Sequence, residues 1–454
     1  MFQSCRRIVS AGGTMRDPTL RRHFPRPSVA VANAYWRQRT LLGAGELSPR
    51  AVVRMRNAEG PPRGLRWTAS PFPPILGSCD ITPLVSAMAH PVARFATRIA
   101  YGATQLPRVA WYMGHGVVMR RLSAAVRQRA GQSARRPAGT TVPVPERSRL
   151  YADMAALFRQ DLANVEAGIY PLPAEHDGSW PALLYRSRLF FEDLPDVHRR
   201  RENRDHRQVL TEETRGKRPG YYLQNFHFQS GGWLTDESAR RYDTQVEVLF
   251  NGTANATRRQ ALPPLYEVFS GRDQRRLRLL DVGCGTGRFL DFLKQTWPRL
   301  PALGIDMSEA YVAEAKRHLK RRCWIDLLVA NGEAIPLENE SQDAVSSIFM
   351  FHELPPKVRR TVFREFARVL KPGGRLVVLD SLQIGDEPDY DGMLELFPQS
   401  YHEPYYIGYL REDFRAIAAG CGLTHVRDVN AFVSKVMVFD KPSRRAAPRL
   451  RQTA

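Results

Sequence analysis

Three glycines at alternate positions mark the part of this sequence best suited to binding a ligand. In LLDVGCGTGRFLDFL (279–293), Gly283, Gly285 and Gly287 separate an apolar run from a segment with helical apolar spacing. Glycines at a strand-to-helix turn let backbone N–H groups approach a ligand with no Cβ in the way, and the following helix adds the positive end of its dipole. The sequence therefore predicts a ligand held by the backbone at this turn.

The spacing of the glycines narrows the choice of ligand. A nicotinamide or flavin cofactor requires G-x-G-x-x-G, and a nucleotide-phosphate loop requires a Lys-Ser/Thr pair, whereas this loop reads G-x-G-x-G without that pair. Asp306 ends the next predicted strand, 23 positions after Gly283. A carboxylate there can accept hydrogen bonds from both hydroxyls of a ribose. The residues thus indicate a ligand that carries a ribose.

Five apolar runs and three amphipathic segments must position this loop. The runs LRLLDVG, ALGID, IDLLV, DAVSSIFMF and RLVVLD predict short buried strands, and the segments near 287–297, 308–321 and 356–370 predict helices. Strands that alternate with helices at this spacing form a parallel sheet covered on both faces, so the predicted fold class is α/β. FVSKVMVFDK (432–441) alternates apolar and polar residues and predicts a closing antiparallel edge strand.

The ordered motifs of residues 276–440 resemble the class I S-adenosylmethionine-dependent methyltransferase domain, of the broad group that includes methyltransferase type 11 and the ubiquinone and menaquinone methyltransferases. LLDVGCGTGRFL is similar to its first motif, and GIDMSEAYVAEAK to its second. ANGEAIPLENESQDAVSSIFMFHEL is similar to its adenine-side loop and fourth strand, and FREFARVLKPGGRLVVLD to the helix, turn and strand that follow. The resemblance implies a Rossmann-like doubly wound sheet of seven strands with the last one antiparallel, S-adenosylmethionine as cofactor, and methyl transfer as the activity.

The same resemblance implies a cofactor site at one edge of the sheet. The residues expected around the methionine and the ribose of the cofactor are Asp281, Gly283, Gly285, Gly287, Asp306 and Met307. On the adenine side the family usually has Asp-Ala, whereas this chain has Asn331 and Gly332. An Asn carbonyl still accepts a hydrogen bond from the adenine amino group, although without the charge.

The segment before the sheet is rich in aromatic residues. NFHFQSGGWLTDESARRYDTQVEVLFNG (225–252) contains a helix predicted to be capped at Thr235 or Asp236. In the resembling enzymes a helix at this place closes over the cofactor. We therefore expect Tyr242 and Gln245 near the sulfonium or the carboxylate of the cofactor, with a plain packing helix as the alternative.

Candidate catalytic residues follow from the chemistry of the sulfonium. Its methyl group is already electrophilic, so the protein mainly aligns an acceptor and excludes water, and a base helps if the acceptor is a phenol or an acidic carbon. His352 and Glu353 follow the fourth strand, where a strand–helix corner is the alternative role. His402 lies in FPQSYHEPYYIGYLREDF (397–414), whose aromatic residues suit a small aromatic, quinone-type or lipid-like acceptor; the alternative is a surface loop.

The chain is predicted to contain several parts besides this domain. These are a disordered or targeting-like extension (1–87), a helical region (88–220) with a linker (131–148), lid helices (221–275), the methyltransferase domain (276–441) and a disordered tail (442–454). The Arg-rich, acid-poor start fits disorder, an organellar transit peptide, or translation that begins at Met88. The sequence does not separate these alternatives.

The formal net charge of +21 raises the question of a nucleic-acid partner. Residues 277–440 carry 20 Lys and Arg against 23 Asp and Glu, so the positive excess lies outside the predicted domain. Nearly all of it is Arg, which a composition bias explains as well as phosphate contacts do. Two alternatives to a small-molecule enzyme stay open. One is a methyltransferase that acts on RNA or protein, and the other is a cofactor-binding member of the fold without turnover.

The cysteines and the hydropathy of the chain indicate its cellular compartment and its relation to a membrane. The five cysteines include no C-x-x-C pair, so they indicate neither a metal site nor a disulfide framework and suit a reducing, cytoplasmic location. IAYGATQLPRVAWYMGHGVVM (99–119) contains Pro107, Arg108 and His115, which disfavour a membrane span. This segment either packs on its own domain or makes a peripheral contact with a membrane surface. The sequence predicts no oligomeric state.

Overall fold

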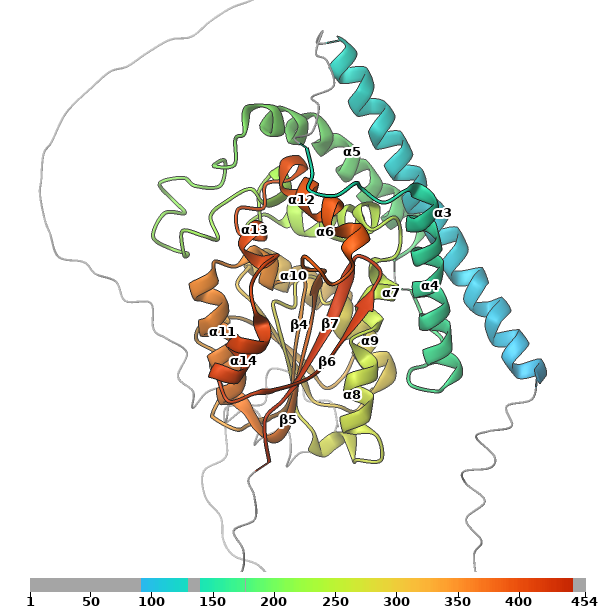
Figure 1. Ribbon diagram of the computed structural model, residues 1–454, viewed down its shortest axis with the longest axis vertical. Helices are drawn as coiled ribbons and strands as arrows, with labels where there is room; N and C mark the ends of the chain where they lie inside the picture. The colour runs from blue at the N-terminus through green and yellow to red at the C-terminus, as the bar shows by residue number, and fades with distance from the viewer. Residues whose placement is uncertain (1–90, 130–138, 176, 444–454) are drawn as a thin grey trace, which may run out of the picture. The chain divides into compact units, whose positions relative to one another are not determined.

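A computed structural model describes residues 91–129, 139–175 and 177–443 (Figure 1). The predicted extension (1–87), the start at Met88 and nearly all of the predicted tail lie outside the described residues, as does the 131–138 part of the predicted linker. Within the described ranges, no helix is both long and apolar enough to cross a membrane.

The centre of the fold is a seven-stranded sheet with the order β3-β2-β1-β4-β5-β7-β6. Its strands are β1 (Leu279–Val282), β2 (Ala302–Asp306), β3 (Ile325–Val329), β4 (Gln342–Ile348), β5 (Leu370–Ser381), β6 (Thr424–Ala431) and β7 (Ser434–Asp440). The first five strands pair in parallel, and β7 pairs antiparallel with β5 and β6. The sheet has the α/β, Rossmann-like class that the sequence predicts, and its five parallel strands lie where the apolar runs are.

Two predictions about the sheet edges need correction. The segment 432–441 does not form the edge, because β7 pairs on both sides and is buried along its length except at Asp440. The edge strand is β6, whose side chains are mostly exposed or half-buried. At the opposite edge, β3 is half-buried throughout rather than buried, since it has one neighbouring strand, β2.

Helices cover both faces of the sheet, as the alternation predicts. On one face lie α8 (Leu262–Phe269) and α9 (Arg288–Thr296), whose apolar side chains share a core with β1, β5 and β7. On the other face lie α11 (Pro356–Val369) and α14 (Phe414–Gly420) (Figure 1). Contacts between phenylalanine rings join these two helices. The helix α10 (Glu309–His318) packs beside β2 and β3.

The region before the sheet is helical and packs on it. Its helices are α3 (Pro91–Arg129), α4 (Arg147–Glu166), α5 (Trp180–Asn203), α6 (Asp236–Leu249) and α7 (Ala254–Arg259). Helix α3 packs against α4, α5 and α6 through buried side chains at three- and four-residue intervals, including Tyr101, Arg108 and Tyr112. The segment 99–119 therefore has one face on its own domain. Helix α6 is capped by Thr235, whose hydroxyl accepts a hydrogen bond from the Ser238 amide, as the sequence predicted.

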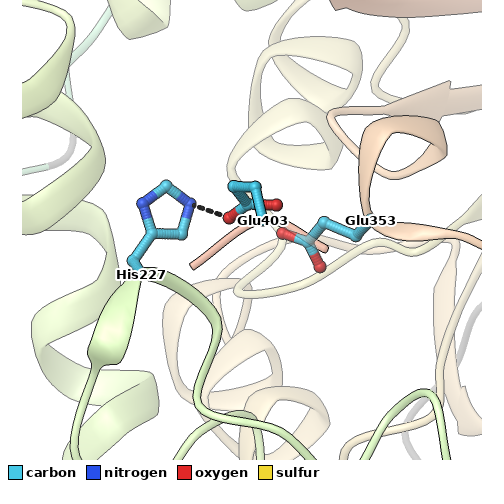
Figure 2. Close-up of side chains that lie close together, drawn as sticks. All are labelled: His227, Glu353 and Glu403. Carbon is cyan, nitrogen blue, oxygen red and sulfur yellow. Dashed lines mark ion pairs between the residues drawn. The ribbon is translucent and has the colours of Figure 1, made fainter. Parts of the chain in front are cut away.

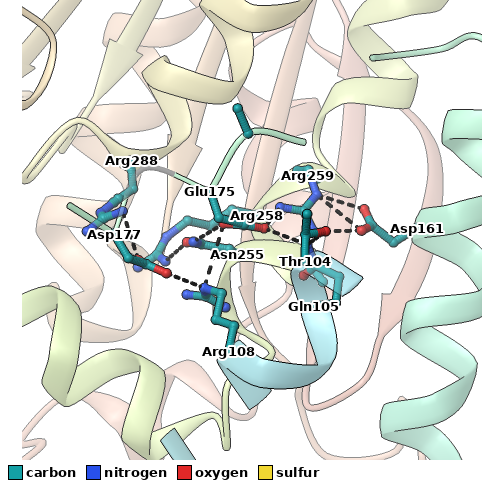
Figure 3. Close-up of polar contacts among 12 residues, drawn as sticks. Thr104, Gln105, Arg108, Asp161, Glu175, Asp177, Asn255, Arg258, Arg259 and Arg288 are labelled. Carbon is teal, nitrogen blue, oxygen red and sulfur yellow. Dashed lines mark hydrogen bonds and ion pairs between the residues drawn. The ribbon is translucent and has the colours of Figure 1, made fainter. Parts of the chain in front are cut away.

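A buried cation, Arg259 at the end of α7, links this helix to α4 (Figure 3). The Arg259 guanidinium lies 2.6 Å from an oxygen of Asp161 on α4 and 2.6 Å from an oxygen of Glu175. All three side chains are nearly inaccessible to solvent, and Tyr170 also donates a hydrogen bond to Asp161. Charges buried in this way are stable only while each keeps its partners.

A second set of buried ion pairs reaches the glycine loop. Asp177 lies 2.7 Å from Arg108 of α3 and 3.3 Å from Arg288, the first residue of α9 (Figure 3). Arg288 also lies 2.7 Å from Asp243 of α6. The helix that follows the glycines is thus fixed to both α6 and α3.

Replacing Arg259 by Met should lower the free energy of unfolding by about 3–5 kcal/mol, because two buried carboxylates lose their shared cation. Urea unfolding of the full chain measures the change. Arg188→Ala is the matched control, since it removes an exposed pair with Glu192 and should change stability little. Similar small changes in both variants would contradict the importance of this network.

Candidate functional site

A cavity of about 120 Å³, called here the loop cavity, lies at the glycine turn. Several residues that the sequence singled out as cofactor-binding line it together, namely Tyr242, Gly283, Gly285, Asp306, Met307, Asn331 and Gly332. They come from α6 and from the carboxyl ends of β1, β2 and β3, which meet at one edge because the strands are parallel. Aromatic side chains of Tyr222, Phe226 and Trp233 complete the wall.

Three of the predicted residues do not line the loop cavity. Asp281 is buried under it and accepts a hydrogen bond from the Ser346 hydroxyl at 2.7 Å. Gly287 allows close packing on α10, since a Cβ there would lie 2.7 Å from the Leu319 side chain. Gln245 is the third, and its buried Oε1 accepts no hydrogen bond from the described residues.

Asp306 is held in a fixed orientation at the mouth of the glycine turn. One carboxylate oxygen accepts the Gly285 amide at 2.9 Å and the other accepts the Ser308 amide at 2.8 Å. Burial raises the pKa of Asp306, while these hydrogen bonds act in the opposite direction. At Gly285 the backbone is left-handed, with φ of 52°, and a Cβ would meet no atom within 4 Å. A ligand can therefore approach the backbone at this position, as the sequence predicted.

Asn331, which the sequence predicts to lie on the adenine side, uses its side chain within its own turn. Its carbonyl oxygen accepts the Glu333 amide at 2.9 Å. Glu333 in turn accepts a hydrogen bond from the Tyr221 hydroxyl at 2.7 Å. An amide oxygen has two lone pairs, so Asn331 retains one acceptor position toward the loop cavity.

A second cavity, of about 380 Å³ and called here the helix cavity, lies beside the first. Three residues line both cavities: Tyr242, Phe349 and Glu353. The helix cavity is otherwise walled largely by apolar side chains of α3, α4, α6 and α12 (Asp391–Ser400), among them Met113, Leu150, Met154, Val246 and Leu394. The sequence did not reveal this role of the N-terminal helices, because helical spacing shows that a face is buried and not what it faces.

Ionisable side chains gather at the junction of the two cavities. The His352 Nδ1 lies 2.6 Å from the buried Asp380 carboxylate. Burial alone would lower the pKa of His352, but Asp380 outweighs it and raises the pKa to about 9. On the carboxyl group of Glu353 burial has the opposite effect: it raises the pKa, and the neighbouring Glu403 carboxylate adds to that shift. Glu403 itself lies 2.9 Å from His227 (Figure 2).

The structure brings Glu403 to this junction rather than the predicted His402. The His402 ring stacks on His206, with ring centroids 4.1 Å apart, and its Nε2 hydrogen-bonds with the Gln224 side chain at 2.8 Å. It lines neither cavity, and burial lowers its pKa to about 4. His227 was also missed as a functional candidate, since nothing in the sequence distinguishes it from the aromatic residues beside it.

Comparison with known proteins agrees with this geometry. Residues 279–374 match a family described as a methyltransferase domain. The chain is 30% identical over 183 residues to the demethylmenaquinone methyltransferase of Thermotoga maritima, covering 40% of this chain and 75% of that relative. This chain belongs to the class I S-adenosylmethionine-dependent methyltransferases. Like them it is an enzyme that uses S-adenosylmethionine as its cofactor.

Other relatives of this methyltransferase match over shorter stretches. The ubiquinone/menaquinone biosynthesis C-methyltransferase UbiE of Syntrophotalea carbinolica is 34% identical over 151 residues, covering 33% of this chain and 60% of that protein. The malonyl-[acyl-carrier protein] O-methyltransferase of Methylococcus capsulatus is 35% identical over 99 residues, covering 22% of this chain and 35% of that protein. This methyltransferase thus spans less than two thirds of the length of both.

Asp306→Ala should weaken the binding of S-adenosylmethionine to this methyltransferase by about 10- to 100-fold, because the ribose would lose charge-assisted hydrogen bonds. Isothermal titration calorimetry measures the change. Glu309→Ala is the control, since that side chain is exposed three residues further along. Unchanged affinity in a folded Asp306→Ala variant would contradict the expected role of this carboxylate.

A pH effect is expected from Asp281, because burial raises its pKa to about 7 and the Asp306 carboxylate acts in the same direction. The folded state then holds a proton that the unfolded state releases near pH 4, so this stabilisation is lost as the pH rises from about 4 to 7. In Asp281→Asn the amide carries no titrating proton. Urea unfolding at pH 5 and pH 7.5 should therefore show a smaller decrease in stability for this variant than for the wild type. Equal decreases would show that Asp281 is ionised throughout this range.

Proposed function

We propose that this methyltransferase transfers a methyl group to a small, largely apolar acceptor bound in the helix cavity. The observation that carries the proposal is that Tyr242, Phe349 and Glu353 line both cavities, so the two cavities meet at these residues. A cofactor in the loop cavity would have its methyl group next to an acceptor bound where the cavities meet. Holding both molecules in line is the main requirement of such a transfer.

The cofactor is proposed to lie along the carboxyl edge of the sheet. Asp306 would accept hydrogen bonds from the ribose, and Gly283 and Gly285 would lie against the methionine. Asn331 and Gly332 would line the adenine side. Support comes from their position around one cavity and from the open space at Gly285.

An aromatic, quinone-type or lipid-like acceptor fits the helix cavity best. A cavity of about 380 Å³ is within the usual size of a small-molecule site, and its wall is mostly aliphatic and aromatic. Two of the relatives named above carry names from quinone biosynthesis, which agrees with this class of acceptor.

The sulfonium of the cofactor supplies the electrophilic methyl group when it is bound. The residues of this chain would then align the acceptor, exclude water and stabilise the loss of its proton. Phe349 and Tyr242 present rings at the junction, and Phe250 packs on Phe349 with ring centroids 5.2 Å apart. The ionisable groups of Glu353 and His227 line the helix cavity beside them. This side of the junction is where the acceptor atom would lose its proton.

Val246→Trp tests the acceptor site, because the indole should fill the helix cavity without touching the loop cavity. We expect at least a tenfold decrease in transfer of labelled methyl groups from S-adenosylmethionine to the organic-soluble fraction of a cell extract, about the scale of losing 1.4 kcal/mol. The affinity for the cofactor should stay within about twofold of the wild-type value.

Glu237→Trp is the matched control, since it puts the same side chain on the exposed face of α6. It should leave both transfer and cofactor binding unchanged. Label found in the RNA or protein fraction alone would contradict the proposal and support the alternative acceptors. Absence of label from every fraction, with cofactor binding intact, would indicate a member of the fold without turnover.

A further inference from the structure

Three potential metal ligands lie close together (Figure 2), and two of them, His227 and Glu353, line the helix cavity. The group consists of His227 from the short 3₁₀ helix η1 (Phe226–Phe228), Glu353 from the short 3₁₀ helix η3 (Phe351–Glu353) after β4, and Glu403 from the loop before α13 (Tyr406–Tyr409). One ligand atom from each residue lies within 4.8 Å of the others. Among the described residues, this is the group of three that could hold a metal ion.

Glu403 is buried without the hydrogen bonds that a carboxylate normally requires. Its side chain has no exposed surface, and neither oxygen accepts a hydrogen bond from the described residues. It points toward His227 and Glu353 (Figure 2). Two carboxylates so close together in a buried place repel each other unless a proton or a cation lies between them. The neighbouring His352 has its Nδ1 2.6 Å from the Asp380 carboxylate, and its Nε2 is farther, 3.8 Å, from Glu353.

The spacing of the three groups is close to that of ligands around one ion. Bonds of about 2.0–2.2 Å put two ligands about 3 Å apart at a right angle and about 4.3 Å apart across the ion. The distance between His227 Nε2 and Glu403 Oε1 is 2.9 Å, which fits a right-angle pair. The distances from the Glu353 ligand atom to the other two are at most 4.8 Å, which is about 0.5 Å beyond the widest spacing around one ion.

We propose that His227, Glu353 and Glu403 bind one divalent transition-metal ion. One imidazole with two carboxylates is a ligand set that suits Mn²⁺, Fe²⁺ or Zn²⁺ better than Ca²⁺ or Cu⁺. Asp380 and His352 form an outer layer, because the His352 Nε2 lies 3.8 Å from Glu353. The sequence analysis expected no metal site because the cysteines are scattered. The proposed site does not depend on them, since none of its ligands is a sulfur atom.

The ion would face the acceptor, because His227 and Glu353 line the helix cavity. Its remaining coordination positions would take an oxygen of the acceptor and make that hydroxyl or enol more acidic. The preferred acceptors of this enzyme would then carry an oxygen near the methylated atom. This catalytic role rests on the proposed function, whereas binding of the ion is measured without any acceptor.

The test uses the full chain, stripped with a chelator and titrated calorimetrically with Mn²⁺ and with Zn²⁺. Elemental analysis of the protein purified without chelators gives the stoichiometry. We expect one ion per chain, and at least about 100-fold weaker binding in Glu403→Gln and in Glu353→Gln, because loss of a direct ligand exceeds the effect of losing its outer partners. His402→Gln is the matched control and should bind the ion as the wild type does.

The affinity for S-adenosylmethionine reports on folding in Glu403→Gln and His402→Gln and should be unchanged there, since neither residue lines the loop cavity. Glu353 lines that cavity, so folding of Glu353→Gln is checked by thermal unfolding instead. A wild-type chain that binds neither ion at millimolar concentration would overturn the proposal and leave a shared proton between the two carboxylates. Equal metal affinity in the wild type and both Gln variants would overturn it as well. Either result leaves the proposed function standing, because methyl transfer to the organic-soluble fraction is measured separately.

Discussion

The buried pairing of arginines with carboxylates is the interaction on which the rest of this structure depends. Arg259 joins α7 to Asp161 of α4, and Asp177 bridges Arg108 of α3 and Arg288 beside the glycine loop. Such groups are costly to bury singly, so the helices and the sheet can dock in this arrangement only when every pair forms. The same contacts that hold the N-terminal helices in place also hold the start of α9.

This docking creates a cavity that the methyltransferase domain lacks by itself. The edge of the sheet and aromatic residues just before it wall the loop cavity, whereas α3 and α4 supply part of the wall of the helix cavity. The methyltransferase family match covers residues 279–374, and both helices lie before it. Part of the proposed acceptor site is therefore built by a segment outside that family match.

Some of the many arginines of the chain have a structural role. Arg108, Arg258 and Arg259 are each buried in the fold and face carboxylates. Arginine suits such positions because its planar guanidinium serves several carboxylate oxygens at once. Part of the arginine outside the sheet domain thus serves internal ion pairs, which are neutral as pairs and leave the net positive excess unaccounted for.

The sequence by itself determined the features that depend on local pattern. Apolar runs located the five parallel strands, the glycine spacing located the turn with its open backbone at Gly285, and Thr235 marked the start of α6. Tertiary structure decided what depends on contacts between distant segments: that β7 lies inside the sheet, that α3 walls a cavity, and that Glu403 rather than His402 meets His227 and Glu353. Alternation within a strand or helix shows which side chains share a face, but it contains no information about the partner of that face, since partners far apart in the chain are chosen by packing and charge.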